Sequence, residues 1–392
     1  MNPLLTGSLD TVALLGAVAR ASCTLALEPI MTRGDSPTTL ADVTAPWVER
    51  VLQRDFPQAR VTAAESLETT TGTTDRARVS VTYAAPGPAN GPASLFVKLA
   101  PAGMATRVFG DLMNLGATEV RFYRTVAPEV PVLIPRSYDA GIDSRTGRFA
   151  LVLEDLVAED ATFTDVSQPV TAEVARRVVG DLARLHAAFW TSPRFHGDLA
   201  WLKTPYRNPT IRLERALCRA ALGPGLRRFP ELIPETIQRA APRILAARDR
   251  LDARWATQPL TLIHGDSHSG NLYFVGDRIG FLDWQVTQCG PGLRDVSYFL
   301  ISSVPTEIRL AHQRDLLAHY LASLTAAGVD APPFAEAWFD HRLHACHAWI
   351  AAVVTAAAAT LQIEPIARAA MARANQALVD LDTLAALADL EA

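Results

Sequence analysis

The hydrophobic pattern of this chain changes its period near Glu154, and that change limits the folds the chain can adopt. Before it, apolar and polar residues alternate at 79–83 and 95–99, the two-residue period of half-buried strands. After it, apolar residues recur every three or four positions at 174–189, the period of an amphipathic helix. We therefore expect an α+β fold in which a small antiparallel sheet precedes a larger, mainly helical part.

The length of 392 residues exceeds what one hydrophobic core usually spans, so we expect two lobes. The small lobe is placed at 37–154 and the large lobe at 155–392, with a helical insertion at about 193–258. Residues 1–36 end in a turn-rich segment, which predicts a loosely attached N-terminal extension.

Composition excludes several classes of function. The formal net charge of -4 provides no field that would attract nucleic acid or an anionic membrane. The four cysteines are widely separated, which argues against disulfides and zinc and favours a reducing cytoplasm. No positive charge precedes the apolar stretch 12–18, and the Ala-rich run 348–361 is too short to span a bilayer. We expect a cytoplasmic protein that binds neither nucleic acid nor membrane.

Three strand-like segments interrupt the helical part, at 260–263, 272–275 and 279–282, and residues 276–278 join the last two as a hairpin. Between the first two lies the loop His264–Asn271, of sequence His-Gly-Asp-Ser-His-Ser-Gly-Asn. A loop held between strands is a rigid place for polar side chains, which makes it the first candidate for a site.

The polar residues of this loop suit phosphoryl transfer. That reaction needs a carboxylate to accept a hydroxyl proton, oxygen ligands for Mg²⁺, and a cation on the phosphates. Asp266 is the candidate base, while Asn271 and Asp283 offer oxygens to a hard cation. His268 is the candidate for touching the acceptor. The other interpretation is a tight turn in which Asp266 only caps backbone amides.

A second His-Gly-Asp tripeptide, at His196–Asp198, shows that the tripeptide alone is weak evidence. It is followed by Lys203 where the asparagine should stand, and by no hairpin or further aspartate. We therefore interpret Asp198 as a structural residue.

The missing cation is predicted at Lys98. Only two of the 37 basic residues are lysine, so a generic positive charge in this chain is almost always an arginine. A lysine therefore indicates a specific role. Lys98 lies in a strand on the face opposite Leu95 and Val97, and its compact charge fits between phosphate oxygens. Glu119, on a predicted helix, is its expected counter-ion, although a surface lysine and a surface glutamate would look the same individually.

Two further segments are candidates for nucleotide contacts. The loop Thr69–Thr74 precedes the lysine strand, so Thr71, Gly72, Thr73 and Thr74 could cover the phosphates; an ordinary hairpin turn is the alternative. Glu154 and Leu156 mark the switch between the lobes, where backbone groups could pair with an adenine.

Taken in order, these motifs resemble those of the aminoglycoside phosphotransferase and choline kinase superfamily. Their residue sequences are most similar to the ecdysteroid-kinase-like branch. They are the following: Lys98, Glu119, Leu153–Leu156, Leu182–His186, the loop His264–Asn271, Asp283-Trp284 and Asp295. The resemblance covers about Thr69 to Asp295.

The resemblance implies a bilobal protein-kinase-like fold, ATP or GTP as the donor, and Mg²⁺ on Asn271 and Asp283. It also implies that Asp295 braces the catalytic loop and that the small lobe binds the nucleotide. The expected activity is transfer of the γ-phosphate to a hydroxyl of a small molecule. A catalytically inactive nucleotide-binding regulator is the alternative, supported by the single glycine of the Thr-rich loop.

The acceptor is expected to be neutral or anionic. The segment Trp201–Gln258, where the superfamily inserts acceptor-binding helices, carries 12 Lys/Arg against five Asp/Glu. A polycationic aminoglycoside would need an acidic wall instead.

Three histidines, His341, His344 and His347, share a predicted helix at i, i+3, i+6 spacing. Three interpretations remain open: a metal site, an acceptor pocket in which His344 or Trp349 stacks on the substrate, and a plain buried helix.

Overall fold

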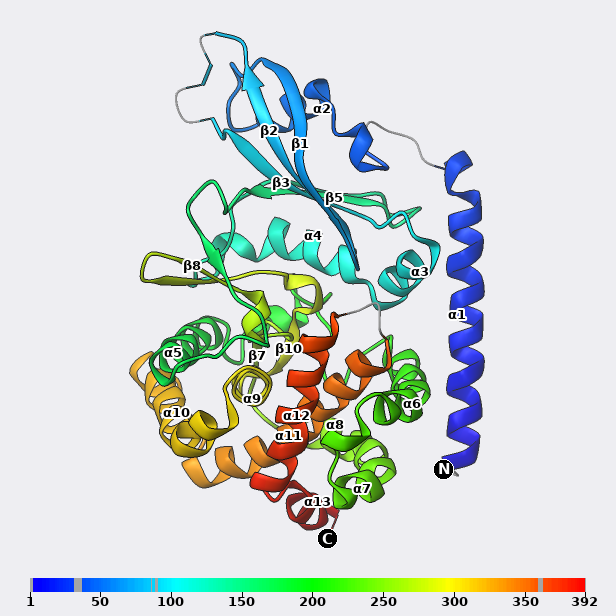
Figure 1. Cartoon of the computed structure of the whole chain (residues 1–392), viewed down its shortest axis with the longest axis vertical. Coiled ribbons are helices and arrows are strands. Elements are labelled where there is room, and N and C mark those ends of the chain that lie inside the picture. Colours follow the sequence, from blue (N-terminus) through cyan, green and yellow to red (C-terminus); the bar gives the residue numbers. More distant parts are fainter. Residues whose placement is uncertain (1–2, 32–36, 86, 89–90, 359–361, 392) are drawn as a thin grey trace.

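A five-stranded sheet stands at one end of the molecule and a mass of helices at the other (Figure 1). The computed structural model describes residues 3–31, 37–85, 87–88, 91–358 and 362–391. The expected α+β class, with a small antiparallel sheet before a larger helical part, is confirmed. We call the part from α2 to β5 the sheet lobe and the part from β6 to α13 the helical lobe.

Up to the end of the sheet lobe, the elements are α1 (Pro3–Met31), α2 (Ala45–Leu52), β1 (Val61–Thr71), β2 (Asp75–Tyr83), β3 (Ser94–Leu99), α3 (Met104–Met113), α4 (Leu115–Thr125), β4 (Ser137–Ile142) and β5 (Phe149–Glu154). The helical lobe continues with β6 (Thr162–Phe163), α5 (Ala172–Ala188), α6 (Ile211–Arg228), α7 (Glu235–Ala246), α8 (Arg248–Ala256), β7 (Leu260–Ile263), β8 (Leu272–Val275), β9 (Arg278–Phe281) and β10 (Gln288–Pro291). It ends with α9 (Leu293–Ser302), α10 (Thr306–Ala326), α11 (Phe334–Ala357), α12 (Glu364–Asp380) and α13 (Thr383–Glu391).

The strands of the sheet lobe lie in the order β1-β2-β3-β5-β4, and every neighbouring pair is antiparallel. Alternation in β3 sends Leu95 and Val97 into a core that α2 covers with Trp47. The same alternation directs Lys98 to the opposite face, toward the helical lobe, as the sequence predicted. The position of Lys98 is therefore fixed by the burial of its apolar neighbours.

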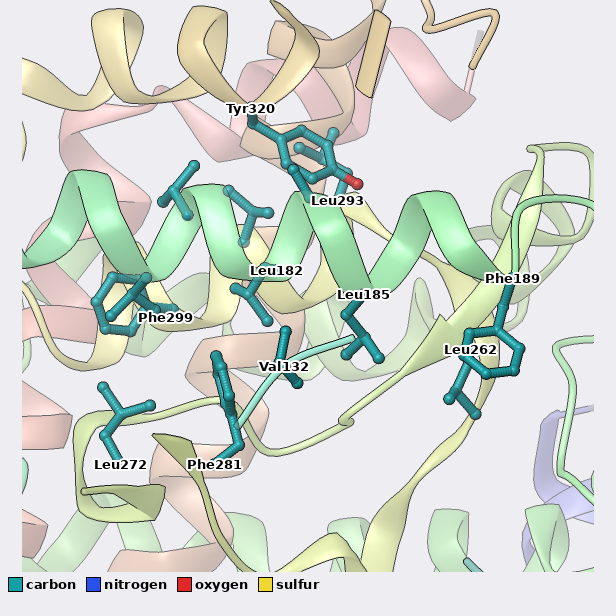
Figure 2. Close-up of a cluster of buried hydrophobic side chains, with 14 of the residues drawn as sticks. Val132, Leu182, Leu185, Phe189, Leu262, Leu272, Phe281, Leu293, Phe299 and Tyr320 are labelled. Carbon is teal, nitrogen blue, oxygen red and sulfur yellow. The ribbon is translucent and has the colours of Figure 1, made fainter. Parts of the chain in front are cut away.

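The helical lobe has its main core between α5, α9 and the strands β7 to β9. Figure 2 shows Leu182 and Leu185 of α5 facing Phe281 of β9, with Phe299 of α9 beside them. A second core joins α7, α8 and α11 to α13, centred on Trp255 and Trp349.

The predicted hairpin within the helical lobe is present. Val275 pairs with Arg278, so the turn is the two residues Gly276 and Asp277, one fewer than expected. Gly276 has φ = +55°, the conformation that such tight turns require. The strand β7 does not join this hairpin but pairs with β10.

Helix α1 corrects the expectation of a loosely attached extension. It packs against α3 of the sheet lobe and α6 of the helical lobe, and runs alongside both in Figure 1. Near its C-terminal end, the carboxylate of Glu28 is buried and accepts hydrogen bonds from Arg107 and Arg148. The turn-rich residues 32–36 lie outside the described residues.

The Ala-rich run falls in α11, as a buried helix, up to Ala357, and its residues 359–361 lie outside the described ones. Among the helices described, none combines the length and apolar character needed to cross a membrane.

The two lobes meet at an aromatic stack. Phe122 of α4 lies parallel to Trp284, which follows β9, with ring centroids 4.1 Å apart and an interplanar angle of 7°. Both side chains are fully buried. The stack fixes α4, and with it Glu119, against the strand end that carries Asp283.

Replacing Phe122 by alanine removes this stack and leaves a cavity, so we expect Phe122→Ala to lower the free energy of unfolding by about 3–5 kcal/mol. Urea denaturation measures the change. The matched control is Phe163→Ala, because that ring is half exposed; a loss in the control as large as that in Phe122→Ala would contradict the role given to the stack.

Candidate active site

The loop His264–Asn271 runs from the end of β7 to the start of β8 and turns sharply at its second residue. Gly265 has φ = +87°, and a Cβ atom there would lie 2.4 Å from the backbone oxygen of Val286. Only glycine fits this close approach. The Gly of His-Gly-Asp thus lets the chain fold over so that Asp266 is presented at the surface of the lobe.

Asp295, on the first turn of α9, holds the loop through its backbone. Its carboxylate accepts the backbone N–H of His264 at 2.6 Å and that of Gly265 at 2.9 Å. His186 of α5 lies 3.4 Å from the same carboxylate, and its other ring nitrogen contacts Tyr320. Burial alone would raise the pKa of Asp295, but these hydrogen bonds and the neighbouring histidines lower it below the ordinary value, so the brace stays ionised.

His264 ties the loop to the hairpin. Its Nδ1 accepts the backbone N–H of Asp266 at 3.2 Å, so Nε2 is the nitrogen that carries the proton and donates to the Leu282 carbonyl at 2.7 Å. The backbone of Leu282 also donates to the Asn271 carbonyl at 2.8 Å. Asp266, Asn271 and Asp283 therefore belong to one connected unit.

Asp266 is surrounded by donors. Asn271 Nδ2 donates to its backbone oxygen at 2.8 Å and to its carboxylate at 3.2 Å, and His268 Nε2 lies 3.4 Å from the carboxylate. Burial opposes ionisation, but the charge and hydrogen bond of His268, with His264 and the hydroxyl of Tyr298, lower the pKa of Asp266 far below its usual range. The pKa of His268 is raised in turn, because Asp266 outweighs the effect of burial.

Lys98, Glu119 and Asp283 form a buried triad across the lobe boundary. Lys98 Nζ donates to Glu119 Oε1 at 2.7 Å and to Asp283 Oδ1 at 3.0 Å. Burial alone would lower the pKa of Lys98, but the two carboxylates raise it above the ordinary value, so the lysine stays charged. Burial also raises the pKa of Glu119, whose Oε2 has no partner among the described residues.

Asp283 adopts a left-handed backbone conformation, with φ = +61° and ψ = +64°. Aspartate is one of the few non-glycine residues that tolerate this region. The chain leaves β9 there, and the turn directs the carboxylate toward Lys98 instead of along the strand. Its second oxygen accepts a hydrogen bond from Gln285 at 3.3 Å.

A cavity of about 380 Å³ separates the sheet from this unit. Of the residues predicted to bind nucleotide or metal, it is lined by Lys98, Glu119, Glu154, Leu156, Asn271 and Asp283. Thr71, Gly72, Thr73 and Thr74 form the tip of the β1–β2 hairpin and are not part of the lining, although the neighbouring Thr70 is.

Two arginines that sequence reasoning missed line the same cavity, Arg76 and Arg78 of β2. Arg76 pairs across the sheet with Lys98, and its buried Nε has no partner among the described residues. Arg78 is held by Asp155 at 3.0 Å. Two-residue alternation from the buried Ala77 and Val79 could have placed both arginines on the cavity face.

Other candidates lie outside this cavity. Asp198 of the second His-Gly-Asp is exposed and pairs with Arg194. Trp349 is buried and donates to Asn375 at 2.8 Å, which makes it a core residue. His341 contacts Ser297, and the described residues contain no group of three His, Cys, Asp or Glu side chains able to hold a metal ion.

Residues 73–328, more than half of the chain, match the ecdysteroid kinase-like family. The chain belongs to this family. The resemblance expected from the motifs is thereby confirmed, and with it the assignment to a family of kinases that act on small molecules.

Solved structures with similar folds are distant from this ecdysteroid kinase-like protein. A choline kinase from Streptococcus pneumoniae is 13% identical, with a TM-score of 0.45, and the match covers 85% of this chain and 99% of that one. A macrolide 2'-phosphotransferase from Brachybacterium faecium is 17% identical, with a TM-score of 0.41 and coverage of 81% and 98%. An amicoumacin kinase bound to AMP-PNP and Ca²⁺ is 12% identical, with a TM-score of 0.48 and coverage of 81% and 88%. No curated protein matches the sequence.

The oxygens of the kinase-like unit fit Mg²⁺. Asn271 uses its nitrogen on Asp266, which leaves Oδ1 for a cation, and Asp283 contributes a carboxylate to the same cavity. Mg²⁺ is typically bound by one or two protein oxygens, with substrate phosphates and water completing its shell. Two protein ligands are therefore a sufficient set.

The ion pair between His268 and Asp266 should make stability depend on pH. A histidine whose folded pKa is raised contributes its full stabilisation below its unfolded pKa of 6.5, and that contribution is lost as the pH rises through the folded value. We expect His268→Asn to cost about 1 kcal/mol in acid and much less in alkali. Thermal melting of the nucleotide-free protein across pH measures this; the exposed His312→Asn is the control, and a pH-independent difference would contradict the ion pair.

Proposed function

We propose that the chain transfers the γ-phosphoryl group of ATP or GTP to a hydroxyl of a small molecule. The triad of Lys98, Glu119 and Asp283 carries this proposal. A fully charged lysine is kept at the wall of a cavity by two carboxylates, and Asn271 reaches the same cavity beside the loop that presents Asp266. Phosphoryl transfer needs this set of groups and little else from the protein.

The donor nucleotide fits the cavity in one orientation. At the lobe switch, the backbone N–H of Leu156 donates to no described residue, so it is free to pair with a purine. Phe96 and Leu153, which are paired on neighbouring strands of the sheet, provide apolar surface in the same cavity. Lys98 and Arg76 lie deeper, and their charges can replace the phosphate donors that a glycine-rich loop would supply.

The acceptor hydroxyl is placed at Asp266. The oxygen of the acceptor hydroxyl forms a bond to the γ-phosphorus. At the same time the bond from that phosphorus to the β,γ-bridging oxygen breaks, and the nucleoside diphosphate leaves with the electron pair. The hydroxyl proton passes to the Asp266 carboxylate. Mg²⁺ bound to Asn271 and Asp283 would neutralise charge on the phosphates.

The electrostatics around Asp266 suit this role. Its lowered pKa keeps it ionised at neutral pH, ready to orient a hydroxyl and receive its proton. A carboxylate of low pKa is a weak base, so proton transfer comes late, as expected for a loose transition state. His268 lies beside the carboxylate and can also contact the acceptor.

We expect Asp266→Asn to lower kcat by at least about 100-fold, because the amide cannot accept the proton. Release of nucleoside diphosphate in the presence of an acceptor measures the change. Asp198→Asn is the matched control, because it makes the same substitution in the second His-Gly-Asp, where the side chain pairs with Arg194 at the surface. Equal losses in both variants would refute the assignment of Asp266.

Asp283→Ala tests the metal assignment. Without this carboxylate, Mg²⁺ loses one of its two protein ligands, so nucleotide should no longer stabilise the protein more strongly in the presence of Mg²⁺ than in its absence. The shift in melting temperature with ATP, with and without Mg²⁺, measures this linkage. Stabilisation that survives removal of divalent cations in the wild type, or is unchanged in the variant, would exclude this mode of metal binding.

A further inference from the structure

Behind the catalytic loop lies a group of side chains to which the phosphotransfer site assigns no role. We call it the Arg294 cluster: Arg294 of α9, Gln288 of β10, Trp255 of α8, and His344 and His347 of α11. Arg294 donates to Gln288 at 3.1 Å, and its guanidinium lies 5.6 Å from the centre of the Trp255 ring. The ring of Trp255 stacks on His344 at 5.1 Å, and His347 meets its edge at 6.2 Å.

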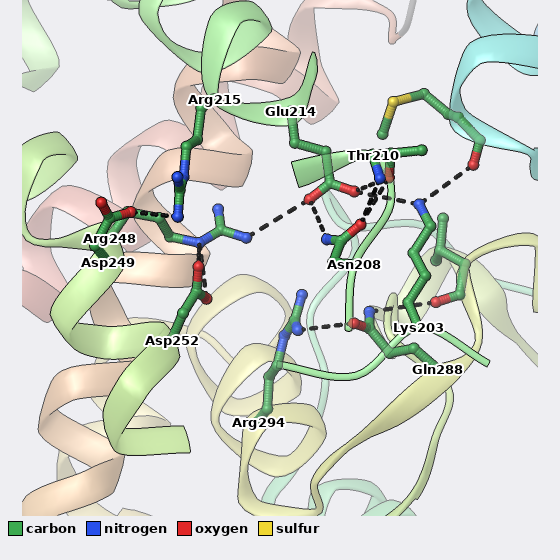
Figure 3. A network of polar contacts seen from close by, with 12 residues as sticks. Lys203, Asn208, Thr210, Glu214, Arg215, Arg248, Asp249, Asp252, Gln288 and Arg294 are labelled. Atoms are coloured by element: carbon green, nitrogen blue, oxygen red, sulfur yellow. Dashed lines mark hydrogen bonds and ion pairs between the residues drawn. The ribbon is translucent and has the colours of Figure 1, made fainter. Parts of the chain in front are cut away.

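Arg294 is the cation left over in a network whose other charges are matched. Figure 3 shows Lys203 with Glu214, Arg215 with Asp249, and Arg248 with Asp252. Within the described part of the chain, Arg294 forms no ion pair, and its Nε has no hydrogen-bond partner. Burial, and after it the neighbouring Arg248, lower the pKa of Arg294 more than the charges of Asp252, Asp295 and Glu214 raise it.

The polar atoms around Arg294 are also unsatisfied. His344 is 1% exposed, yet neither of its ring nitrogens has a partner among the described residues, and the same holds for Nε1 of the buried Trp255. Buried polar atoms are nearly always hydrogen-bonded, and leaving one unpaired costs roughly 1–3 kcal/mol. These unpartnered atoms belong to the same cluster as a guanidinium that has no carboxylate partner among the described residues, and a polar ligand would complete such a cluster.

The cluster is connected to the catalytic base. Tyr298 lies four residues after Arg294 on α9, and therefore on the same face of the helix. The hydroxyl of Tyr298 lies near the Asp266 carboxylate and helps to lower its pKa, and the Tyr298 ring lies 5.6 Å from that of His347. A path of partly exposed side chains thus leads from Asp266 past Tyr298 and His347 to Arg294.

We propose that the acceptor is a hydroxylated organic acid whose carboxylate binds Arg294 while its hydroxyl lies at Asp266. This inference rests on the phosphotransfer function proposed above and specifies its substrate class. The flat guanidinium fork matches a carboxylate in a bidentate manner, and Gln288 fixes the orientation of the fork.

Charge excludes the opposite class. A polycationic acceptor would bring its ammonium groups beside an unneutralised arginine, with Arg248 close behind it. Like charges in such a partly desolvated place repel strongly. An acid gains instead an ion pair with Arg294, which forms none with the described residues.

The test uses linear ω-hydroxycarboxylic acids of increasing length, each compared with the α,ω-diol of the same length. Wild-type protein with Mg²⁺ and ATP should phosphorylate one acid with a kcat/KM at least about tenfold above that of its diol, a difference of one charge-assisted contact. Arg294→Gln should abolish this preference, and Arg294→Lys should keep part of it, because lysine retains the charge without the fork. The exposed Arg250→Gln on α8 is the control and should keep the full preference.

Calorimetric binding of the same probes in the presence of AMP-PNP separates this inference from the phosphotransfer itself. Acid binding that depends on Arg294, with no phosphate transferred to any probe, would retain the anion site and refute the proposed function. Equal binding of acids and diols, no binding of any acid, or a preference that persists in Arg294→Gln would overturn the anion site.

Discussion

A charged lysine buried between two carboxylates is the constraint on which the rest of this structure depends. Lys98 comes from the middle of the sheet, Glu119 from the helix beneath it, and Asp283 from the end of a hairpin in the other lobe. Removing one partner of such a group leaves an uncompensated buried charge, which costs about 3–5 kcal/mol. Three segments far apart in the sequence must therefore arrive together. The stack of Phe122 on Trp284 supplies apolar burial at the same junction, so packing and electrostatics favour one arrangement of the lobes.

The loop His264–Asn271 is held on the opposite side by a second buried acid. Asp295 uses both carboxylate oxygens on the backbone of the loop. His186 of α5 contacts the same carboxylate and is held in turn by Tyr320 of α10. Positive φ values at Gly265 and Asp283 bend the chain toward the cavity at the two ends of this unit. The side chains that would touch nucleotide are therefore preorganised by contacts made beneath them, which is what precise placement of reacting groups requires.

Local signals in the sequence were enough to predict the elements whose buried apolar residues recur at a regular spacing. The alternation in β3, the amphipathic pattern of α5 and the turn of the β8–β9 hairpin each predicted an element that is present. Strands β1 and β4 carry weak patterns, because neither has one cleanly buried face, and they are stabilised by pairing with β2 and β5. The packing of α1 on both lobes depends on tertiary contacts such as that of Glu28, which no short segment of sequence can reveal.

In the candidate site, too, some residues were visible in the local sequence and others only in the tertiary structure. Lys98 was predictable because lysine is rare in this chain, whereas Arg76 and Arg294 were hidden among many arginines. The two residue types are nevertheless used differently. Lysine stands where a compact charge must fit between two carboxylates, and it bonds both of them. Arg294 presents a planar fork that forms no ion pair with any described carboxylate. An arginine-rich segment therefore says little until the structure shows which of its charges are already matched. Arg294, which forms no ion pair with any described residue, lies one helical turn from Tyr298, whose hydroxyl lies near Asp266.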